Sequence, residues 1–243
     1  MAKLQFIDVH SHILPGVDDG SGSMEETMQM LKIAEEEGIT TFVATPHYVA
    51  GSKNVTRDQL IDVRNQVLDN ARQHDLNIDI LLGNEIFYSE SVLEDVIAGK
   101  AMTLANSRYV LIEFGMKECF QTIYHGLSQF VLSGYAPILA HAERYDCLVK
   151  REDLIEDLIK LGCYIQMNSK SLDGGFLNTE AAFNRKLVSK GLVHFIGTDC
   201  HGDKKRPPCI KNAYKAMSKH MSDIDIQKLF KENPRKILEN KYI

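Results

Sequence analysis

Short apolar runs and longer amphipathic segments alternate along nearly the whole chain. Runs of four to seven residues, bounded by polar or turn residues, predict buried β-strands. Seven of them cover residues 6–9, 39–45, 78–82, 109–112, 137–140, 163–168 and 193–197. Apolar residues spaced three and four apart predict helices, at about residues 24–37, 57–74, 91–98, 118–133, 151–161, 179–190, 209–220 and 224–230. The first helix follows a capping sequence, Ser23 with Glu26 three positions later, and Gly38 ends it.

Alternation of strands and helices is typical of an α/β fold in which helical crossovers join parallel strands. Seven such units without an intervening linker predict a distorted TIM-like (β/α)7 barrel, in a single domain of residues 1–243. A doubly wound open sheet is the alternative. The sequence has no glycine-rich fingerprint after the first strand and no Walker sequence, which argues against nucleotide-binding folds.

The first predicted strand ends in two histidines separated by one residue. Residues i and i+2 of a strand lie on the same face. His10 and His12 should therefore point the same way, with about 7 Å between their Cα atoms. Two imidazoles on one side of a strand end can bind the same metal ion. An ordinary pair of polar residues at a strand end is the alternative interpretation.

Other predicted strands also end in residues of the kinds that bind metals. The full set comprises His10, His12, Asp18, His47, Glu85, Glu113, His141, Asp199 and His201. In a parallel barrel the carboxyl ends of the strands meet on one rim, where active sites form. Taken singly, each could be a packing residue or a helix N-cap, but that interpretation needs a separate explanation at six of seven strands. The remaining histidines fall elsewhere and are interpreted as structural or surface residues.

The composition of this set predicts the kind and number of ions. Imidazole combined with carboxylate oxygen suits Mn²⁺, Fe²⁺ or Zn²⁺ and argues against a sulfur-rich structural zinc site. Nine ligands are too many for one ion, so two or three ions are expected, with a carboxylate such as Glu85 bridging. Three divalent ions beside four carboxylates leave two positive charges, which match a phosphate monoester dianion. Clustered ions also activate water for an in-line displacement.

Two arginines adjoin the predicted ligands. Arg144 comes three residues after His141, and Arg206 lies just beyond His201. A guanidinium group near the metals would hold phosphate oxygens in a two-point contact. We therefore predict Arg144 and Arg206 as catalytic residues; solvated surface arginines are the alternative.

Charge and composition restrict the partners. The net charge is −5 and the pI about 6.0, so a nucleic-acid partner is not expected, since its phosphates favour a basic surface. No apolar run approaches the roughly 20 residues of a membrane span, and the N-terminal residues show no signal peptide. Five scattered cysteines without a CxxC pair are unlike a disulfide framework and favour a cytoplasmic protein.

Together these residues resemble the polymerase and histidinol phosphatase (PHP) superfamily. The similarity includes HxH after the first strand, TPH at 45–47 and DxH at 199–201. Narrower stretches are IDVHSHIL at 7–14, VDDG at 17–20, LIEF at 111–114, AHAERY at 140–145 and RPP at 206–208. They resemble the CpsB/CapC branch, the manganese-dependent protein-tyrosine phosphatases of bacterial capsule and exopolysaccharide systems.

The resemblance implies Mn²⁺ as cofactor and three metal sites. One would hold His10, His12, Glu85 and Asp199; a second would share Glu85 and add Glu113 and His141; the third would take Asp18, His47 and His201. Some PHP proteins carry His at the positions of Asp18 and Glu113, and the acids here fit the tyrosine-phosphatase branch. The implied partner is a phosphotyrosine protein, an autophosphorylated bacterial tyrosine kinase with a tyrosine-rich tail.

Three alternatives remain open. A small-molecule phosphomonoesterase of the histidinol phosphatase type would share the metals and the barrel. A binding or scaffold protein with a vestigial metal site is the second, and the intact ligand set argues against it. A cysteine phosphatase is the third, because Cys200 and Arg206 have the spacing C-x5-R. Asp199 and Asp203 would then place negative charge beside the phosphate, which disfavours that mechanism.

Overall fold

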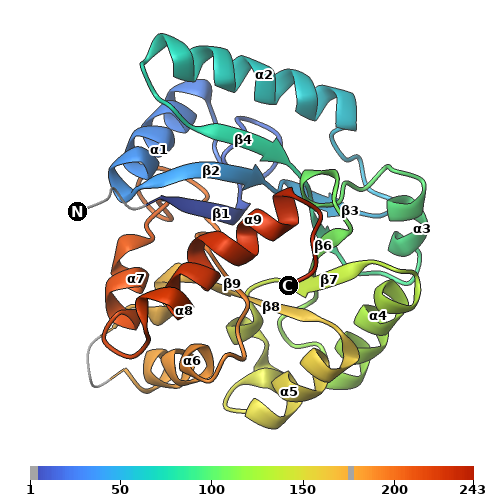
Figure 1. Cartoon of the computed structure of the whole chain (residues 1–243). Coiled ribbons are helices and arrows are strands. Elements are labelled where there is room, and N and C mark those ends of the chain that lie inside the picture. The colour runs from blue at the N-terminus through green and yellow to red at the C-terminus, as the bar shows by residue number, and fades with distance from the viewer. Residues whose placement is uncertain (1–4, 175–177) are drawn as a thin grey trace.

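The computed structural model describes residues 5–174 and 178–243, and this part of the chain has nine strands and nine α-helices (Figure 1). The strands are β1 (Phe6–Ser11), β2 (Ile39–Ala44), β3 (His47–Val49), β4 (Asp79–Leu82), β5 (Glu85–Phe87), β6 (Tyr109–Glu113), β7 (Ala136–Leu139), β8 (Tyr164–Asn168) and β9 (Phe195–Gly197). The α-helices are α1 (Met24–Glu37), α2 (Arg57–Gln73), α3 (Val92–Ile97), α4 (Phe120–Leu132), α5 (Glu152–Leu161), α6 (Thr179–Ser189), α7 (Lys211–Met217), α8 (Asp223–Gln227) and α9 (Asn233–Leu238).

The paired strands of the described chain all run parallel, as the alternation predicted. They form two sheets, ordered β1-β2-β4 and β3-β5-β6-β7-β8-β9. The carboxyl ends of β1 and β9 come together through an isolated bridge between Ser11 and Cys200. The His12 N–H also donates to the Cys200 carbonyl at 2.9 Å. The predicted α/β fold is thus confirmed as a distorted TIM-like barrel that is not closed into one sheet.

Two short strands, β3 and β5, follow the predicted strands at 39–45 and 78–82 and were not expected, so the predicted number of strands was wrong. β2 and β3 are separated by a bend at Pro46, which has no N–H to continue a ladder. β4 and β5 are separated by Gly83 and Asn84, and the Asn84 side chain donates to the Pro46 carbonyl at 2.9 Å. His47 and Glu85, expected at strand ends, are therefore the first residues of β3 and β5.

The first helix has the predicted ends but only half of the predicted capping box. The Ser23 hydroxyl accepts the Glu26 N–H at 3.2 Å, and Gly38 ends the helix with φ of 84°. The Glu26 carboxylate accepts from the Gly22 N–H at 2.8 Å instead. The loop before α1 is thereby tied to its first turn.

The C-terminal helices differ more from their predicted bounds. The helix expected at 209–220 is the shorter α7, and the one expected at 224–230 is α8 followed by a π-helical turn, Lys228–Glu232. A further helix, α9, was not predicted. Pro234 lies in its first turn, where a missing N–H costs no hydrogen bond, so the helical segment continues.

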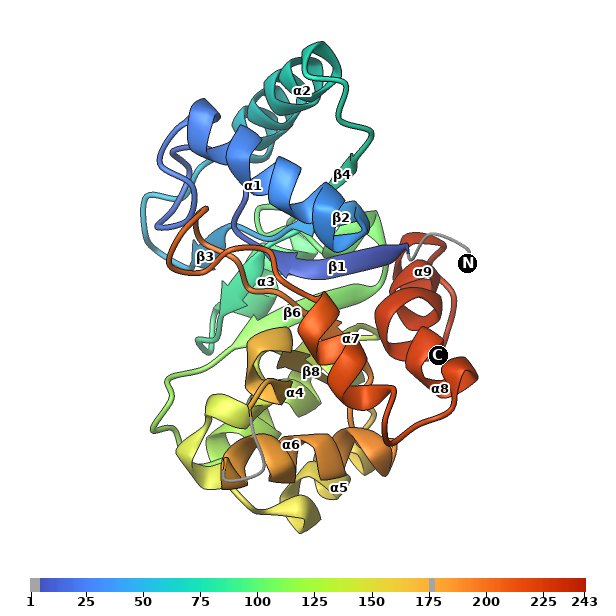
Figure 2. The ribbon, with the colours of Figure 1, turned by 90° about the vertical axis from the view of Figure 1, so that its left-hand side faces the viewer.

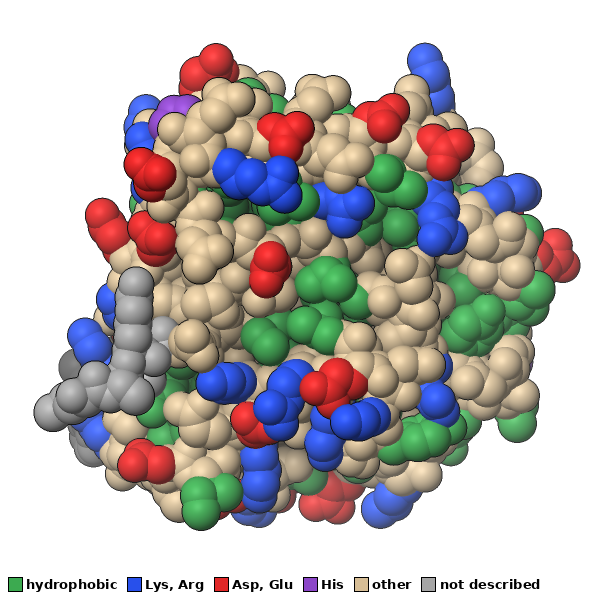
Figure 3. Space-filling model, turned by 45° about the horizontal axis from the view of Figure 1, so that its top comes forward, with side chains coloured by type: hydrophobic (Ala, Val, Ile, Leu, Met, Phe, Trp, Pro, Cys, Tyr) green, Lys and Arg blue, Asp and Glu red, His purple; other side chains and the backbone are tan. Residues whose placement is uncertain are grey.

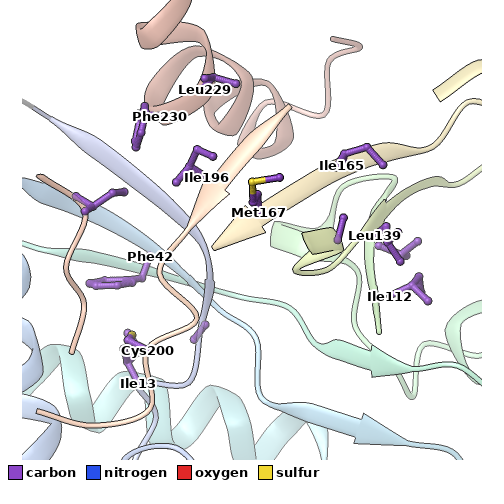
Figure 4. Close-up of a cluster of buried hydrophobic side chains, with 14 of the residues drawn as sticks. Ile13, Phe42, Ile112, Leu139, Ile165, Met167, Ile196, Cys200, Leu229 and Phe230 are labelled. Carbon is purple, nitrogen blue, oxygen red and sulfur yellow. The ribbon is translucent and has the colours of Figure 1, made fainter. Parts of the chain in front are cut away.

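Helices cover the outside of the strands, and the buried apolar side chains form two clusters on opposite faces of the strands. Figure 1 shows α1 and α2 beside β2 and β4, and α4 and α5 beside β7 and β8. Part of the core is shown in Figure 4, where Leu229 and Phe230 of the π-helical turn lie near Ile196 of β9. Within the described residues, no helix is long and apolar enough to span a membrane.

His194, just before β9, is predicted to make the protein sensitive to acid. Its Nδ1 accepts the Ile165 N–H at 3.1 Å, and burial lowers the pKa of His194 to about 4. Since the pKa in the unfolded chain is near 6.5, the folded state resists protonation. The stability contributed by neutral His194 should be lost as pH falls from 6.5 toward 4.

Lowering the pH from 7 to 5 should cost about 2 kcal/mol through this residue. Asn at this position keeps an acceptor for the Ile165 N–H without a titrating ring. We therefore expect His194→Asn to lose less stability over this interval, as measured by urea unfolding at both pH values. Equal losses in the two proteins would show that His194 does not carry the acid sensitivity.

Candidate metal centre

The carboxyl ends of the strands gather on one side of the barrel, and the predicted ligands lie there. In Figure 2 the orange segment after β9 lies beside the blue segment after β1. The Asp199 N–H donates to the His10 carbonyl at 2.8 Å, which fastens these two segments together. The parallel pairing of β3 with β5 sets His47 opposite Glu85. Residues far apart in the sequence therefore share one edge.

His10, His12, Glu85 and Asp199, the residues predicted for the first site, come together and are at most 2% exposed. His10 Nε2 lies 3.2 Å from Glu85 Oε1 and 3.4 Å from Asp199 Oδ1. His12 Nε2 lies 3.2 Å from Glu85 Oε2 and 3.6 Å from Asp199 Oδ1. The two Nε2 atoms are 3.3 Å apart. Ligand atoms about 2.1 Å from one ion lie about 3.0–3.4 Å from one another, so these separations resemble the edges of a coordination shell.

The hydrogen bonds behind these two histidines determine which nitrogen carries the proton. The His141 N–H donates to Gln166 Oε1 at 2.7 Å, so the oxygen of this amide must face it. The same oxygen lies 3.0 Å from His10 Nδ1, which therefore carries the proton. His12 Nδ1 donates in the same way to Asp18 Oδ2 at 2.7 Å. When the ring is neutral, Nε2 of each histidine therefore has a lone pair directed at the group.

The charges and lone pairs of this first group favour a cation at its centre. Two imidazole lone pairs face the carboxylates of Glu85 and Asp199 in a buried site, which is unfavourable without positive charge. Burial lowers the pKa of His12, but its hydrogen bonds to Asp18 and Glu85 outweigh burial and raise it to about 10. A proton can bridge only one nitrogen and one oxygen of this group, whereas a divalent ion can bind the imidazole nitrogens and the carboxylate oxygens together. The donor set therefore fits Mn²⁺, Fe²⁺ or Zn²⁺.

His141, Glu85 and Glu113, the residues predicted for the second site, also come together. His141 Nε2 lies 2.9 Å from Glu85 Oε1 and 3.3 Å from Glu113 Oε1. Burial lowers the pKa of His141, but its hydrogen bonds to Glu113 and Glu85 raise it to about 10. Glu85 faces both groups with one carboxylate, which is the arrangement expected of a bridging ligand.

The third group differs from the prediction in its carboxylate. His47 Nε2 lies 3.2 Å and His201 Nε2 lies 3.6 Å from Asp19 Oδ1. His12 belongs to the same group, in which one ligand atom of each of the four residues lies within 4.8 Å of the other three. Asp18, predicted for this site, accepts instead from the His12 ring and from the His47 N–H at 3.3 Å. The structure therefore groups Asp19 with the two histidines, whereas Asp18 orients His12.

A relay of side-chain amides, which the sequence reasoning missed, links the ligands from behind. Gln166 Oε1 holds His10, as described above, and its Nε2 donates to Asn168 Oδ1 at 3.0 Å. Asn168 Nδ2 then donates to Asp199 Oδ2 at 2.7 Å. Both amides are buried. Polar residues inside the apolar run 163–168 were the signal that could have revealed them.

Two acids near the ligands were also missed. Asp8, buried in β1, accepts the Thr198 N–H at 3.0 Å, and burial raises the pKa of Asp8 to about 6. Its position inside an apolar strand was a visible signal. Asp19 had no such signal, because the adjacent Asp18 has the same side chain and no pattern separates the two.

Two of the predicted ligands have a left-handed backbone. His141 has φ of 32° and Asp199 has φ of 51°. Residues with a Cβ avoid this region, and such strain is found most often at functional sites. Each lies two residues after a strand, β7 or β9, where the sharp turn aims the side chain at the cluster.

Both predicted arginines lie at the rim of the cluster. Arg144, in the 3-10 turn η2 (Ala142–Arg144), has Nη1 3.6 Å from Asp199 Oδ2. Arg206 forms an ion pair with the same oxygen. The side chains are 43% and 40% exposed, so each guanidinium group also faces solvent.

Cys200 lies in the wrong surroundings for a nucleophile. It is fully buried, and Figure 4 shows it near Ile13 and Phe42 in the apolar core. Burial raises the pKa of its thiol well above the usual 9, whereas a nucleophilic cysteine must be a thiolate. The C-x5-R interpretation therefore has no support in the structure.

Metal binding is expected to stabilise the protein measurably. At a hundred times the dissociation constant, a ligand adds about 2.7 kcal/mol, which corresponds to a rise in Tm of about 5–10 °C for a chain of this size. We expect Mn²⁺ to produce such a rise in metal-stripped protein, followed by differential scanning fluorimetry. Elemental analysis should find two or three ions per chain.

Glu85→Gln, which keeps the shape of the side chain and removes its charge, should lose most of this stabilisation. Glu90→Gln, at an exposed position, is the matched control and should keep it. A Tm unchanged by Mn²⁺, Fe²⁺ and Zn²⁺ would argue against the metal centre.

Known proteins resemble this chain over most of its length. The family model "Capsular polysaccharide synthesis, CpsB/CapC" matches residues 6–239. The tyrosine-protein phosphatase CpsB of Streptococcus pneumoniae is 35% identical over 242 residues, which cover 98% of this chain and 100% of that protein. The tyrosine-protein phosphatase YwqE of Bacillus subtilis is 30% identical over 237 residues, 98% of this chain and 93% of YwqE.

Solved structures agree with these sequence matches. The crystal structures of YwqE from Bacillus subtilis and CpsB from Streptococcus pneumoniae, described as unique metal-dependent tyrosine phosphatases, include a chain with a TM-score of 0.89 and 30% identity. The match covers 98% of this chain and 96% of that one. A histidinol phosphate phosphatase from Lactococcus lactis, with a TM-score of 0.58 and 14% identity over 89% of this chain and 94% of that one, shares the fold. The chain belongs to the CpsB/CapC family.

Proposed function

We propose that this chain is a metal-dependent phosphatase that hydrolyses phosphotyrosine in proteins. The observation that carries the proposal is the buried group of imidazole and carboxylate donors with Arg144 and Arg206 at its rim. Phosphate monoester hydrolysis needs an activated water and positive charge around the transferring group, and this arrangement is suited to both. The names of the relatives CpsB and YwqE support phosphotyrosine as the substrate.

The metal ligands in this proposal follow the observed groups. They are His10, His12, Glu85 and Asp199 for one ion, Glu85, Glu113 and His141 for a second, and His47, His201 and Asp19 for a third. Mn²⁺ is the proposed ion, because the CpsB/CapC resemblance implies it. When bound, the ions would lower the pKa of a water and neutralise phosphate oxygens. Gln166 and Asp18 keep the protons of His10 and His12 on Nδ1, so that Nε2 faces the ion.

The two arginines are proposed to hold the phosphate. Each guanidinium group is anchored on one side by Asp199 and open to solvent on the other. A phosphate at the rim of the cluster would meet N–H donors from both. Charge spreads over the non-bridging oxygens in the transition state, and cations placed there count most at that stage.

The proposed substrate protein is a bacterial tyrosine kinase that acts in capsule or exopolysaccharide synthesis. The description of the matching family as capsular polysaccharide synthesis supports this setting. We further propose that the protein works in the cytoplasm. Its five cysteines are unpaired in the structure, as a reducing compartment requires.

The proposal is tested by assaying purified enzyme on phosphotyrosine peptides and on histidinol phosphate. We expect turnover of the peptides, its abolition by chelation, and its recovery best with Mn²⁺. Preference for histidinol phosphate would favour a small-molecule phosphatase instead. Full activity in protein shown by elemental analysis to be free of metal would contradict the mechanism.

Arg144→Ala should lower kcat by about 10²-fold or more, with a smaller change in KM, because the lost contact strengthens in the transition state. Metal content and Tm should stay near those of the wild type, since Arg144 is not a ligand. Arg206→Ala should act in the same direction with a larger effect on KM. Arg72→Ala, which removes an exposed arginine of α2 paired with Asp69, is the control. Wild-type turnover by Arg144→Ala would show that the assignment is wrong.

Cys200→Ser should keep activity within about tenfold, or roughly 1.4 kcal/mol. The thiol is buried in the apolar core and protonated, so it takes no part in the chemistry. Steady-state kinetics and metal analysis of the same preparation provide the measurement. A thousandfold loss in a folded, metal-loaded variant would revive the thiolate mechanism.

A further inference from the structure

A cleft of about 670 Å³ opens beside the metal centre, a volume in the range of ligand pockets. Five basic side chains line it: Arg144, Lys170, Lys204, Lys205 and Arg206. Asp173 is the one carboxylate among the described residues of its lining. The whole chain has a net charge of −5, so the charge of this cleft is opposite to that of the protein.

Lys170, Lys204 and Lys205, the cleft lysines, are gathered in one cleft with free side chains. All three are exposed, and no ion pair or side-chain hydrogen bond within the described residues engages them. Lys186 and Lys190, by contrast, both pair with Glu152. Figure 3 likewise shows a face on which basic and acidic side chains are intermingled. Unpaired cations gathered in a concave surface attract anions.

Hydrogen bonds between the segments that follow β8 and β9 hold the walls of the cleft in place. The His201 N–H donates to the Arg206 carbonyl at 2.9 Å and closes the loop that carries Lys204 and Lys205. The Ser169 hydroxyl donates to the Cys209 carbonyl at 2.6 Å. This bond ties the 3-10 turn η4 (Ser169–Leu172), which carries Lys170, to the segment after β9. The backbone that carries the cleft lysines is therefore held in place before a ligand arrives.

Arg144 and Arg206 belong to the cleft and to the rim of the metal centre at once. A substrate whose phosphate reaches the two arginines therefore brings its neighbouring atoms to the cleft. A second cavity of about 390 Å³ shares Arg144 and Lys170 with the first and extends it. Two adjoining cavities suit a length of peptide better than a single phosphate ion.

We propose that the cleft binds negatively charged side chains next to the phosphotyrosine of the substrate chain. This inference rests on the proposed function, and it specifies in addition that the residues flanking the phosphotyrosine in the substrate are negatively charged. Asp and Glu carboxylates and the phosphate of a neighbouring phosphotyrosine share the required chemistry. Contacts of this kind at a solvent-exposed site should act mainly on binding and should weaken with salt.

The experiment compares three phosphotyrosine peptides of one length with the metal-loaded enzyme. One has Gln on both sides of the phosphotyrosine, one has Glu at the same positions, and one has a non-hydrolysable phosphonate analogue of phosphotyrosine as neighbour. We expect kcat/KM to be roughly tenfold higher for an anionic peptide than for the Gln peptide, chiefly through KM. The ratio should fall toward one at high salt. The Glu and phosphonate arms decide which anion the cleft prefers.

A triple variant, Lys170→Ala with Lys204→Ala and Lys205→Ala, should bring this ratio close to one. The matched control removes three exposed lysines outside the cleft lining: Lys32→Ala, Lys215→Ala and Lys219→Ala. It has the same net charge and should keep the ratio. Thermal unfolding and metal content confirm that both variants are intact.

Equal kcat/KM values for the anionic and Gln peptides would overturn the inference and leave the proposed function standing. So would a preference that survives in the triple variant or disappears equally in the control. Failure of the metal-loaded enzyme to hydrolyse any of the three peptides would overturn both, because no phosphotyrosine substrate would then enter the site.

Discussion

The arrangement of the rim depends on one buried carboxylate, Glu85. It is 1% exposed, and nitrogens of His10, His12, His47 and His141 lie 2.9–3.2 Å from its oxygens. Burial would raise the pKa of Glu85, but these neighbours, His10 first, hold it well below its usual value. An ionised carboxylate in such a place requires positive charge around it. A centre that binds divalent cations meets this requirement, so the stability of this rim and its proposed chemistry have the same origin.

The backbone places that carboxylate by two bends. At Pro46 and at Gly83 with Asn84 the chain leaves one parallel sheet and enters the other, and the new strands pair His47 with Glu85. A Cβ at Gly83 would lie 2.6 Å from a side-chain atom of Leu104, so the bend also requires close approach of the chain. The barrel is therefore not closed into a single sheet, but β3 and β5 begin beside the carboxyl ends of the other strands, where the predicted ligands lie. Left-handed backbone at Asp199 supplies a further sharp turn there.

The local pattern of apolar and polar residues was enough to predict the order of the main strands and helices, because apolar runs and helical periodicity depend only on residues close together in the sequence. It failed where a decision depended on distant contacts. The extra strands β3 and β5 depend on their pairing with each other and with β6 in the second sheet, and α9 packs against β1. The amide relay of Gln166 and Asn168 was hidden for the same reason, since its purpose appears only when His10 and Asp199 lie beside it.

The sequence by itself determined the chemistry of the site: imidazole and carboxylate side chains at strand ends, with two arginines next to them. Residue type and position along the chain carry that information, because parallel strands bring their carboxyl ends to one edge. Tertiary structure alone decided which donors share a group. It set Asp19, and not the identical Asp18 beside it, against His47 and His201, since the loop orients one carboxylate inward to the His12 ring. It also decided that Lys170 and Lys205 share a cleft with both arginines, because proximity between separate loops is a property of the folded chain and not of sequence spacing.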